Sequence, residues 1–292
     1  MSKPTPKLFR INTGSCNGCD VEFVATAFVD KFQLDKLGVE LVEDISQANI
    51  LVITGPLTAR SEPFLKDYIS RLSEPYAVVG IGTCSVTSGI FRDSYAINGP
   101  TDKVVDVDIN IAGCPPRPHS IAEGIAKGIK ILNQKASGEK VSKKIDMILQ
   151  GFEAPKTFRG KISLHVEMCT ACRTCETVCP SGAINITKVG DSYEHKVWHN
   201  TCCFCGNCGF FCPTGAIYNT NDFDTSKHQD EKYSDINLEY IKTDVCSCCK
   251  EVYKKPTKGL LGKAYVYDDV NKLNSNICPK CRKKENFKRM YS

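Results

Sequence analysis

Short apolar runs alternate with longer helix-like stretches over the first 135 residues of the chain. Runs with the character of strands, bounded by glycine, lie at residues 8–12, 50–54, 77–81 and 105–111, with a weaker one at 39–42. Helix-like stretches lie between them at 21–37, 62–72 and 119–133. Apolar strands that alternate with helices are typical of a parallel sheet with helices on both faces. The pattern therefore predicts an α/β domain over residues 1–135.

Four cysteines lie just past the predicted ends of strands in this domain. Cys16 and Cys19 follow the first strand, Cys84 follows the run at 77–81, and Cys114 follows the last run. Ligands of such open, flavodoxin-like sheets bind at the carboxyl ends of the strands. Four thiolates brought together there would hold a 4Fe-4S cubane. The alternative is that Cys84 and Cys114 are small buried apolar side chains, but their positions at loop starts favour the ligand role.

Two copies of the pattern C-x2-C-x2-C-x3-C-P begin 33 residues apart, at residues 169 and 202. Both continue alike, as PSGAI and PTGAI, which indicates an internal duplication. In this bacterial ferredoxin pattern each copy gives three thiolates to one cubane and its fourth thiolate to the other. We therefore expect a ferredoxin-like α+β domain at 160–221 with two 4Fe-4S clusters. Cluster I takes Cys169, Cys172, Cys175 and Cys212, and cluster II takes Cys202, Cys205, Cys208 and Cys179.

The remaining segments are two polar stretches and a basic tail. Residues 136–159 and 222–244 have the composition of linkers. Residues 245–292 hold twelve Lys or Arg against four Asp or Glu, and four cysteines in two C-x2-C pairs. Such pairs suit structural zinc, with a single rubredoxin-like iron, no metal or another cluster as alternatives. The predicted ligands are Cys246, Cys249, Cys278 and Cys281. Cys203 and Cys248 are left over as spare cysteines.

Composition indicates the cellular compartment of the protein and the kinds of partner it binds. Eighteen cysteines in 292 residues, with no signal-like apolar segment after the N-terminus, argue against a secreted disulfide framework and favour the cytoplasm. No apolar stretch is long enough to span a membrane. The net charge of +5 is concentrated in the tail, which we interpret as a solvated or subunit-facing surface. Binding of nucleic acid by this tail is a disfavoured alternative.

Three sequence segments carry a resemblance to a known family. They are SCNGCDVE at 15–22, GTCSVTSG at 82–89 and GCPPRP at 113–118. Over residues 7–130 the chain resembles the small subunit of energy-converting, membrane-bound [NiFe] hydrogenases, which is similar to the 20-kDa subunit of respiratory complex I. The resemblance implies a proximal 4Fe-4S cluster on Cys16, Cys19, Cys84 and Cys114. It also implies a partner large subunit with the nickel–iron site, ion-translocating membrane subunits, and a peripheral position on the cytoplasmic side of the membrane.

Two features set this chain apart from its relatives. The complex I subunit has adjacent cysteines at the first position, whereas this chain has Cys16-Asn-Gly-Cys19, which favours the hydrogenase branch. The ferredoxin domain, a separate subunit in well-known energy-converting enzymes, is fused here.

Glu22 has two interpretations, stabilisation of a helix N-terminus or a role at the cluster or subunit contact. Arg117, beside Cys114, either neutralises cluster charge or serves as a surface residue.

The sequence as a whole predicts an oxidoreductase subunit that conducts electrons and has no catalytic residue of its own. No G-x-G-x-x-G run supports direct binding of NAD. Electrons are expected to pass between ferredoxin and the nickel–iron site of the large subunit through three 4Fe-4S clusters. The alternatives are the small subunit of a soluble, flavin-coupled hydrogenase and a nickel-free complex I-like reductase.

Overall fold

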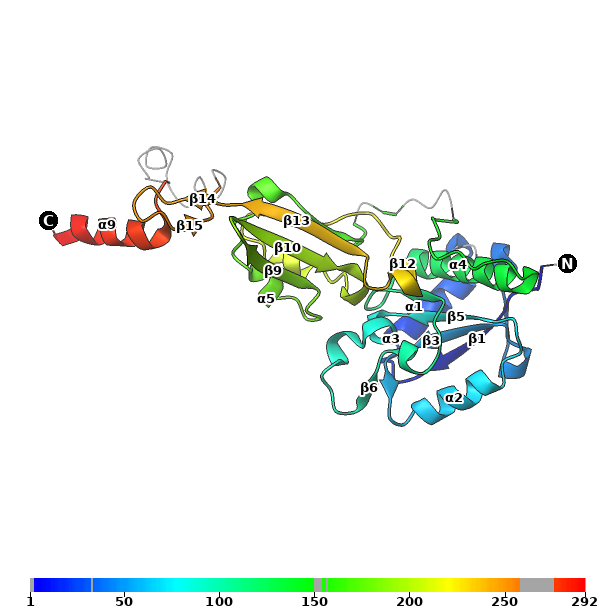
Figure 1. Ribbon diagram of the computed structural model, residues 1–292. Coiled ribbons are helices and arrows are strands. Elements are labelled where there is room, and N and C mark those ends of the chain that lie inside the picture. The colour runs from blue at the N-terminus through cyan, green and yellow to red at the C-terminus, as the bar shows by residue number, and fades with distance from the viewer. Residues whose placement is uncertain (1–2, 33, 150–153, 156, 258–275, 292) are drawn as a thin grey trace.

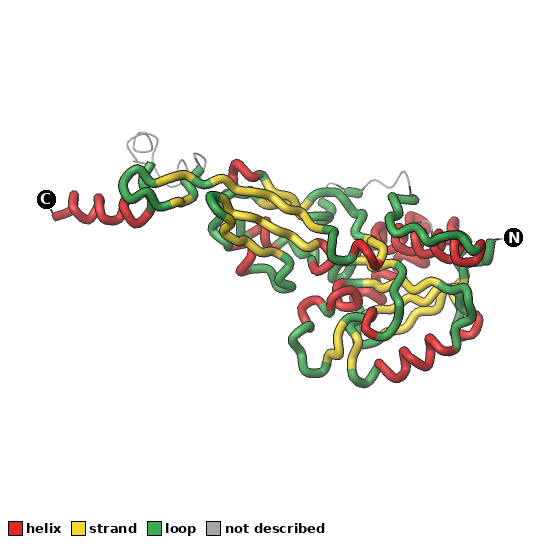
Figure 2. Tube along the Cα trace, in the orientation of Figure 1, coloured by secondary structure: helices red, strands yellow, loops and turns green. Residues whose placement is uncertain are grey.

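The computed structural model describes residues 3–32, 34–149, 154–155, 157–257 and 276–291. An N-terminal α/β domain lies beside a ferredoxin-like domain, and a small cysteine-bearing unit follows at the end farthest from the N-terminal domain (Figure 1). The strands of the ferredoxin-like domain run from the boundary with the first domain toward this small unit (Figure 2). The three parts are therefore arranged in the order in which they occur along the chain.

The N-terminal domain is built on a six-stranded sheet in the order β12-β7-β5-β3-β1-β2. The five strands from the first domain are parallel, in the flavodoxin-like order expected from the sequence. Only β12, from much later in the chain, is antiparallel, so the sheet is mixed. The strands are β1 (Lys7–Asn12), β2 (Glu40–Leu41), β3 (Ile50–Thr54), β5 (Ala77–Ile81), β7 (Ile109–Ile111) and β12 (Ser226–His228).

Helices cover both faces of this sheet and create two separate cores. On one face α1 (Gly18–Phe28) and α4 (Pro118–Ser137) pack on alternate side chains of the strands, among them Val52 and Val79. On the other face α2 (Glu62–Ser70) packs on the intervening side chains, among them Leu51 and Val78. Because successive strand side chains point to opposite faces, strands buried on both faces must be apolar throughout. That requirement explains the uninterrupted apolar runs at 50–54 and 77–81.

Two predicted elements are shorter than their patterns indicated. The helix expected at 21–37 ends at Phe28, because Val29 is extended, and two 3-10 turns follow, η1 (Asp30–Phe32) and η2 (Asp35–Leu37). The run at 105–111 enters the sheet only at Ile109. Its first residues, Val105 and Val107, fill the core beneath α2 instead. In both cases the apolar side chains pack in the core, but their backbone is not part of the regular helix or strand.

Short elements complete the N-terminal domain and shape its loops. A small antiparallel pair, β4 (Leu57–Thr58) with β6 (Ile97–Gly99), lies outside the main sheet. The single-turn helix α3 (Thr83–Thr87) follows β5 directly. The 3-10 turns are η3 (Ile45–Gln47), η4 (Gly89–Phe91) and η5 (Thr101–Lys103).

The ferredoxin-like domain consists of two small sheets and two single-turn helices. One sheet has the order β13-β10-β9 and the other pairs β11 with β8, all antiparallel. A common core of apolar and cysteine side chains joins them. The elements are β8 (Ile162–Leu164), η6 (Val166–Met168), α5 (Thr174–Thr177), β9 (Ile184–Val189), β10 (Ser192–Trp198), η7 (His199–Thr201), α6 (Asn207–Phe210), β11 (Ile217–Asn219) and β13 (Ile236–Lys242).

The segment 222–244 differs from the linker that its polar composition indicated. It contains β12, η8 (Gln229–Glu231) and β13, and so contributes an edge strand to the sheets of both domains. Its polar side chains are used in packing: Lys232 is fully buried and bonds Asp102 at 2.6 Å. Lys127 of α4 donates to Asp224 at 2.6 Å. Composition missed these strands because their charged groups are paired inside the protein and not solvated.

The described part of the stretch 136–159 runs back along α4. The backbone N–H groups of Ile148 and Leu149 donate to the two carboxylate oxygens of Glu123, at 2.7 and 2.9 Å. Glu123 is fully buried, and these bonds satisfy its oxygens.

The C-terminal unit is a two-stranded ribbon and one helix. The strands β14 (Asp244–Val245) and β15 (Val252–Tyr253) pair antiparallel, and α9 (Pro279–Tyr291) follows. Within the parts of the chain described above, no helix is both long enough and apolar enough to cross a bilayer.

Candidate functional site

Three loops at the carboxyl edge of the N-terminal sheet bring four cysteines together, which we call the proximal site. Cys16 and Cys19 lie at the turn from β1 into α1, Cys84 lies in α3 just after β5, and Cys114 follows β7. Electrostatic interaction links Cys19 with Cys16 and Cys114, and Cys84 with the other three. Cys19 is buried, whereas Cys16 and Cys114 are exposed at the protein surface.

Gly82 makes room for the proximal site. A Cβ atom at this position would lie 2.4 Å from the sulfur of Cys19, and the backbone has a φ of +92°. Both the space and the left-handed conformation require glycine. The N–H of Thr83 donates to the carbonyl of Gly113 at 2.8 Å, so the loops that carry Cys84 and Cys114 are bonded to each other.

A buried carboxylate fixes the loop that carries Cys16 and Cys19. Asp20 accepts hydrogen bonds from Thr54 at 2.8 Å, Asn12 at 2.8 Å and Ser15 at 3.0 Å, and pairs with Arg10. These partners come from β1, β3 and the Cys16 loop. A carboxylate with this many donors is rigid, so Asp20 holds the start of α1 against the sheet. The sequence pattern did not single out Asp20, although it lies beside Cys19.

The electrostatics of the proximal site fit a cluster whose iron–sulfur core is positively charged. Burial and then the neighbouring Cys114, Asp20 and Cys16 raise the pKa of Cys19 to about 12. Thiols packed this closely disfavour each other's ionisation. Iron removes the penalty, because a coordinated thiolate is deprotonated by the charge of the metal. The donor set is all sulfur, which is the preference of iron–sulfur clusters.

Glu22 and Arg117 form an ion pair across the mouth of the proximal site. Arg117 Nη1 lies 3.3 Å from Glu22 Oε1, and the arginine side chain is 45% exposed. The pair joins the first turns of α1 and the N-cap of α4. The pair links the loops that carry Cys19 and Cys114. Because it is exposed, it contributes little to the free energy of folding.

The eight ferredoxin-type cysteines line two separate cavities, four in each. Cavity I is lined by Cys169, Cys172, Cys175 and Cys212. Cavity II is lined by Cys179, Cys202, Cys205 and Cys208. Each set combines three cysteines of one motif with the last cysteine of the other, as the sequence pattern led us to expect. Cys203, a fifth cysteine, also borders cavity II.

The two motifs wrap their cavities with the same backbone geometry. Ala171 and Phe204, which occupy equivalent positions, both have positive φ angles, near +50°. Their N–H groups donate to Cys169 and Cys202 at 3.4 and 3.3 Å. After the last cysteine of each motif, the N–H of Ala183 donates to Cys179 at 3.2 Å and that of Ala216 to Cys212 at 3.3 Å.

These backbone donors are aimed at sulfur atoms that would be thiolates in a cluster. Burial opposes the ionisation of Cys212, yet N–H groups of the following turn lower its pKa overall. Hydrogen bonds to the charged form of a group favour that form. His195, fully buried on β10, adds a contact at cavity I, with Nε2 3.7 Å from Cys175 Sγ. His195 was not singled out from the sequence, because only strand pairing brings it to the motif.

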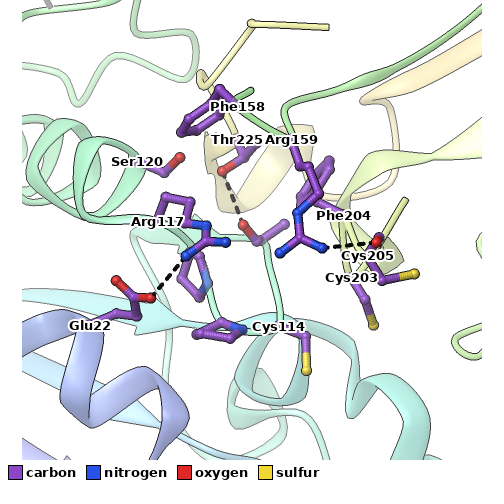
Figure 3. Close-up of a pocket in the computed structure, with 13 residues that line it drawn as sticks. Glu22, Cys114, Arg117, Ser120, Phe158, Arg159, Cys203, Phe204, Cys205 and Thr225 are labelled. Carbon is purple, nitrogen blue, oxygen red and sulfur yellow. Dashed lines mark hydrogen bonds and ion pairs between the residues drawn. The ribbon is translucent and has the colours of Figure 1, made fainter. Parts of the chain in front are cut away.

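The boundary between the two domains places cavity II next to the proximal site. Thr83 Oγ1 donates to the carbonyl oxygen of Cys202 at 2.9 Å, in a buried position. A pocket at this boundary is lined by Cys114 and Arg117 on one side and by Cys203 and Cys205 on the other. Figure 3 shows Cys114 and Cys203 on opposite sides of the boundary, and Arg159 reaching the carbonyl of Cys205 at 3.0 Å.

The four C-terminal cysteines of the two C-x2-C pairs also come together. The sulfur atoms of Cys246, Cys249, Cys278 and Cys281 all lie within 4.8 Å of one another. The N–H of Cys278 donates to the sulfur of Cys246 at 3.1 Å. Cys248 is exposed and outside this group. The set is compact enough for one tetrahedral ion, and four thiolates suit zinc or iron.

Comparison with known proteins agrees with this two-part construction. Residues 16–128 match the family described as NADH ubiquinone oxidoreductase, 20 Kd subunit, and residues 168–217 match the family described as 4Fe-4S dicluster domain. Both the expected family of the first domain and the expected ferredoxin-type second domain are thereby confirmed.

Three relatives of the first domain illustrate its range. The probable membrane-bound hydrogenase subunit mbhJ of Pyrococcus furiosus is 36% identical over 135 residues, which are 46% of this chain and 80% of that protein. Formate hydrogenlyase subunit 7 of Escherichia coli is 37% identical over 134 residues, 46% of this chain and 52% of that one. A subunit of the NADH-quinone oxidoreductase of Heliobacterium modesticaldum is 35% identical over 127 residues, 43% of this chain and 72% of that one.

These relatives are all oxidoreductase subunits, and the family match at residues 16–128 spans the four cysteines of the proximal site. The region shared with these relatives is less than half of this chain, and the dicluster match at residues 168–217 lies outside the family match at residues 16–128. The chain is thus a hydrogenase-like electron-transfer subunit that belongs to the family of the 20 Kd subunit of NADH ubiquinone oxidoreductase, with a 4Fe-4S dicluster domain joined to it.

Proposed function

We propose that this chain conducts electrons between a soluble ferredoxin and the nickel–iron site of a partner hydrogenase large subunit, through three 4Fe-4S clusters. The observation that carries the proposal is the grouping of twelve cysteines into three sets of four, one at the sheet edge and two around ferredoxin-type cavities. Each bound cluster would accept and release one electron at a time. The chain's own residues hold the sulfur ligands, exclude water and set the distances.

The ligand sets of this proposal follow the three groups. The proximal cluster takes Cys16, Cys19, Cys84 and Cys114, cluster I takes Cys169, Cys172, Cys175 and Cys212, and cluster II takes Cys179, Cys202, Cys205 and Cys208. The crossed sharing in the ferredoxin-like domain agrees with the lining of cavities I and II. The N–H groups that point at Cys169, Cys179, Cys202 and Cys212 would stabilise the reduced, more negative clusters.

The geometry also orders the three clusters. Cavity II borders the domain boundary, where Thr83 bonds Cys202 and where Cys114 faces Cys203 across the pocket. Cavity I lies on the other side of the ferredoxin-like domain, where Lys254 of the C-terminal unit acts electrostatically on Cys169. Electrons would therefore travel between cluster I, cluster II and the proximal cluster in that order, in either direction.

An exposed apolar surface beside the proximal site is where the large subunit would dock. Val21, Val24 and Phe28 lie along α1 with large exposed fractions, and Phe28 is 72% exposed. This surface adjoins the exposed Cys16. Exposed apolar patches of this kind mark protein interfaces, and docking here would bury the proximal cluster. Glu22 and Arg117 would lie at the same contact.

The C-terminal unit would bind one structural zinc ion on Cys246, Cys249, Cys278 and Cys281, with a single iron as the alternative. The metal would join β14 and β15 to the start of α9, which otherwise share only a small core. Small units of this size depend on such a metal for their stability. Residues 258–275, which separate the two cysteine pairs, lie outside the described residues.

In the complete enzyme the chain would be a peripheral subunit on the cytoplasmic side of membrane subunits that translocate ions. The name of its relative from Pyrococcus furiosus, a membrane-bound hydrogenase subunit, supports this position. Within the described residues the chain has no spanning helix of its own, so partners would provide the attachment. A soluble flavin-coupled hydrogenase and a nickel-free reductase use the same kind of subunit and are the competing assemblies.

The test is metal analysis of the anaerobically purified native complex. We expect about twelve irons per copy of this chain, together with one zinc, and nickel in the large subunit. The same iron content without nickel would overturn the hydrogenase assignment in favour of a nickel-free reductase. A co-purifying flavoprotein in place of membrane subunits would favour the soluble enzyme. An iron count of about eight per chain would contradict the proximal cluster.

A further inference from the structure

The C-terminal helix α9 carries a dense positive charge that the proposed function does not use. Six of its thirteen residues are Lys or Arg, against one Glu. Lys280 is paired with Glu251 at 3.0 Å. Lys283, Lys284 and Lys288 are exposed, and within the described parts of the chain no acidic side chain pairs with them. These three charges therefore face the solvent.

Two aromatic side chains lie among these lysines. Phe287 is 62% exposed and Tyr291 is 75% exposed, and their ring centroids are 4.6 Å apart. Side chains three and four residues apart are neighbours on a helix, so Phe287 lies beside Lys283 and Lys284. Tyr291 lies beside Lys288 for the same reason. We call these five side chains the basic face of α9.

The unit that carries α9 is attached beside cavity I. The ammonium group of Lys254, which follows β15, donates to the carbonyl oxygen of Lys242, the last residue of β13, at 3.0 Å. In turn, β13 packs against η6, the turn that leads into Cys169 of cavity I. Cys172 of the same motif is exposed. Figure 1 shows α5, which follows this cysteine, at the end of the ferredoxin-like domain that carries the C-terminal unit.

The charge of the chain is unevenly divided between the domain that holds cavity I and the unit beside it. Residues 160–221 contain four Lys or Arg and four Asp or Glu, whereas residues 245–292 contain twelve against four. Opposite net charges accelerate the association of two proteins and orient them as they meet. Of these two regions only the C-terminal unit can attract an approaching protein by charge, and that protein must be acidic.

We propose that the basic face of α9 is a docking surface for a small acidic electron-carrier protein, which it directs to cluster I. The three lysines attract acidic side chains of the carrier, and the two aromatic rings provide apolar contact of the kind found at interface centres. This inference rests on the proposed function, because a carrier is needed only if cluster I conducts electrons. It goes beyond that function by naming the surface that binds the carrier and the charge that the carrier must have.

An anionic membrane is the other partner that a basic helix can bind. Helices that lie on a membrane separate an apolar face, which enters the lipid, from a charged face. In α9 the two rings share one face with the three lysines, so the apolar and the charged groups are not separated. The arrangement therefore favours a protein partner.

The test is the binding of a strongly acidic bacterial-type ferredoxin to the complete complex, measured at several salt concentrations. The test variant combines Lys283→Glu with Lys284→Glu, because glutamate retains a high helix propensity and reverses two charges of the basic face. We expect about tenfold weaker binding at low salt and a smaller salt dependence, because fewer attractive charges remain to be screened. Lys283→Arg with Lys284→Arg keeps both charges and should bind as the unchanged complex does.

The matched control combines Lys140→Glu with Lys144→Glu, at two exposed lysines of the stretch that runs back along α4. It changes the net charge equally but leaves the basic face intact, so ferredoxin should bind as before. Phe287→Ala should weaken binding without changing its salt dependence, because it removes apolar contact alone. The ratio of hydrogen turnover driven by ferredoxin to that driven by reduced methyl viologen, a small molecule that needs no docking surface, should fall with the affinity.

The proposal is overturned if the two double glutamate variants bind ferredoxin equally well. It is also overturned if the Lys283 and Lys284 variant binds ferredoxin normally but no longer binds vesicles of anionic phospholipid, which would assign the basic face to a membrane. Ferredoxin binding that is absent from the unchanged complex, while viologen drives turnover, would overturn this inference and leave the path through the clusters standing. Absence of turnover with both donors would refute the proposed function instead.

Discussion

The hydroxyl of Thr83 donates a 2.9 Å hydrogen bond to the carbonyl oxygen of Cys202, across the boundary between the two domains. The same hydroxyl accepts a 2.9 Å bond from the N–H of Gly113. Thr83 precedes Cys84, and Gly113 precedes Cys114, so one side chain joins the backbone beside two proximal cysteines to that of Cys202, a proposed ligand of cluster II. A single buried hydroxyl therefore sets the distance between two proposed clusters.

Replacing Thr83 by Val should weaken the joint between the domains. The shape is retained, but the N–H of Gly113 and the carbonyl of Cys202 lose a buried partner, at a cost of about 1–3 kcal/mol. We expect a lower temperature of unfolding and a weaker magnetic interaction between cluster II and the proximal cluster. Thr177→Val, at an exposed threonine of α5, is the control and should change neither. Equal effects of the two variants would show that the Thr83 bond has no special role.

Replacing Cys114 by Ser should remove or convert the proximal cluster alone. The iron content is expected to fall by about four per chain, and hydrogen turnover in the complex should stop. The spectroscopic signals of clusters I and II should remain, since their ligands lie around separate cavities. Metal analysis and paramagnetic resonance of the purified complex measure both effects. Unchanged turnover would contradict the assignment of Cys114.

Replacing Gly82 by Ala should also disrupt the proximal cluster, without removing any sulfur. The new Cβ would lie 2.4 Å from the sulfur of Cys19 in a backbone that already has a φ of +92°. Gly138→Ala is the matched control, because its φ is +72° and no atom lies within 4 Å of the added Cβ. That variant bears only the backbone strain, of about 1–2 kcal/mol. Iron content should fall in the first variant and not in the second.

Replacing Asp224 by Asn should destabilise the segment that carries β12. Lys127 is almost fully buried and donates to Asp224 at 2.6 Å. Loss of the charge weakens this bond and leaves the ammonium group with the carboxylate of Glu123, 3.8 Å away, and the carbonyl of Ser226, at a cost of about 1–3 kcal/mol. Urea unfolding at neutral pH measures the difference. Lys143→Gln, which removes an exposed pair with Asp230, is the control and should have little effect.

The effect of Asp224 should depend on pH in a defined direction. Burial raises its pKa, but Lys127 and Lys227 outweigh burial and bring it below the ordinary value of 3.8. A lowered pKa in the folded protein stabilises the fold above the ordinary value, and this contribution disappears as pH falls through the folded value. The stability difference between Asp224→Asn and the unchanged chain should therefore be full at neutral pH and shrink below 3.8. A difference that is constant over this range would contradict the pairing.

Removal of metal from the C-terminal unit should leave the electron-transfer domains intact. We expect a strong zinc chelator to loosen β14, β15 and α9, because their shared core is small, and to leave the iron content unchanged. Limited proteolysis of the complex, with zinc and iron measured in parallel, reports both. Cys249→Ser should reproduce the effect, whereas Cys248→Ser, outside the group of four, should not. Loss of iron with the same treatment would instead indicate a single iron at this site.

Much of the site could be predicted because its chemistry is encoded in local spacing. The first three cysteines of each motif are close in sequence and line one cavity, while the cysteine before the proline lines the other, as in the ferredoxin pattern of the sequence. The apolar runs at 50–54 and 77–81 likewise had to be central strands, because no charged side chain interrupts them. The four proximal cysteines converge because the ends of parallel strands meet at one edge.

The role of the segment 222–244 could not be read from its composition. Polar residues such as Lys232 and Asp224 are typical of linkers, yet here each is paired in or near the interior. Charged residues enter a core only when a partner from another element meets them. Those partners, Asp102 and Lys127, lie 130 and 97 residues away in the chain.

The sequence by itself determined the strand-and-helix pattern of the first domain and the family of that domain, and it predicted the three sets of cysteines, because each depends on residues close together or on motifs kept in order. Only the tertiary structure decided that cavity II, and not cavity I, adjoins the proximal site. The packing of the domains also brought Cys203, a spare cysteine by spacing, to the boundary pocket that Cys114 lines. The physical reason is that a domain interface is formed by side chains distant in sequence, whose contacts leave no periodic pattern along the chain.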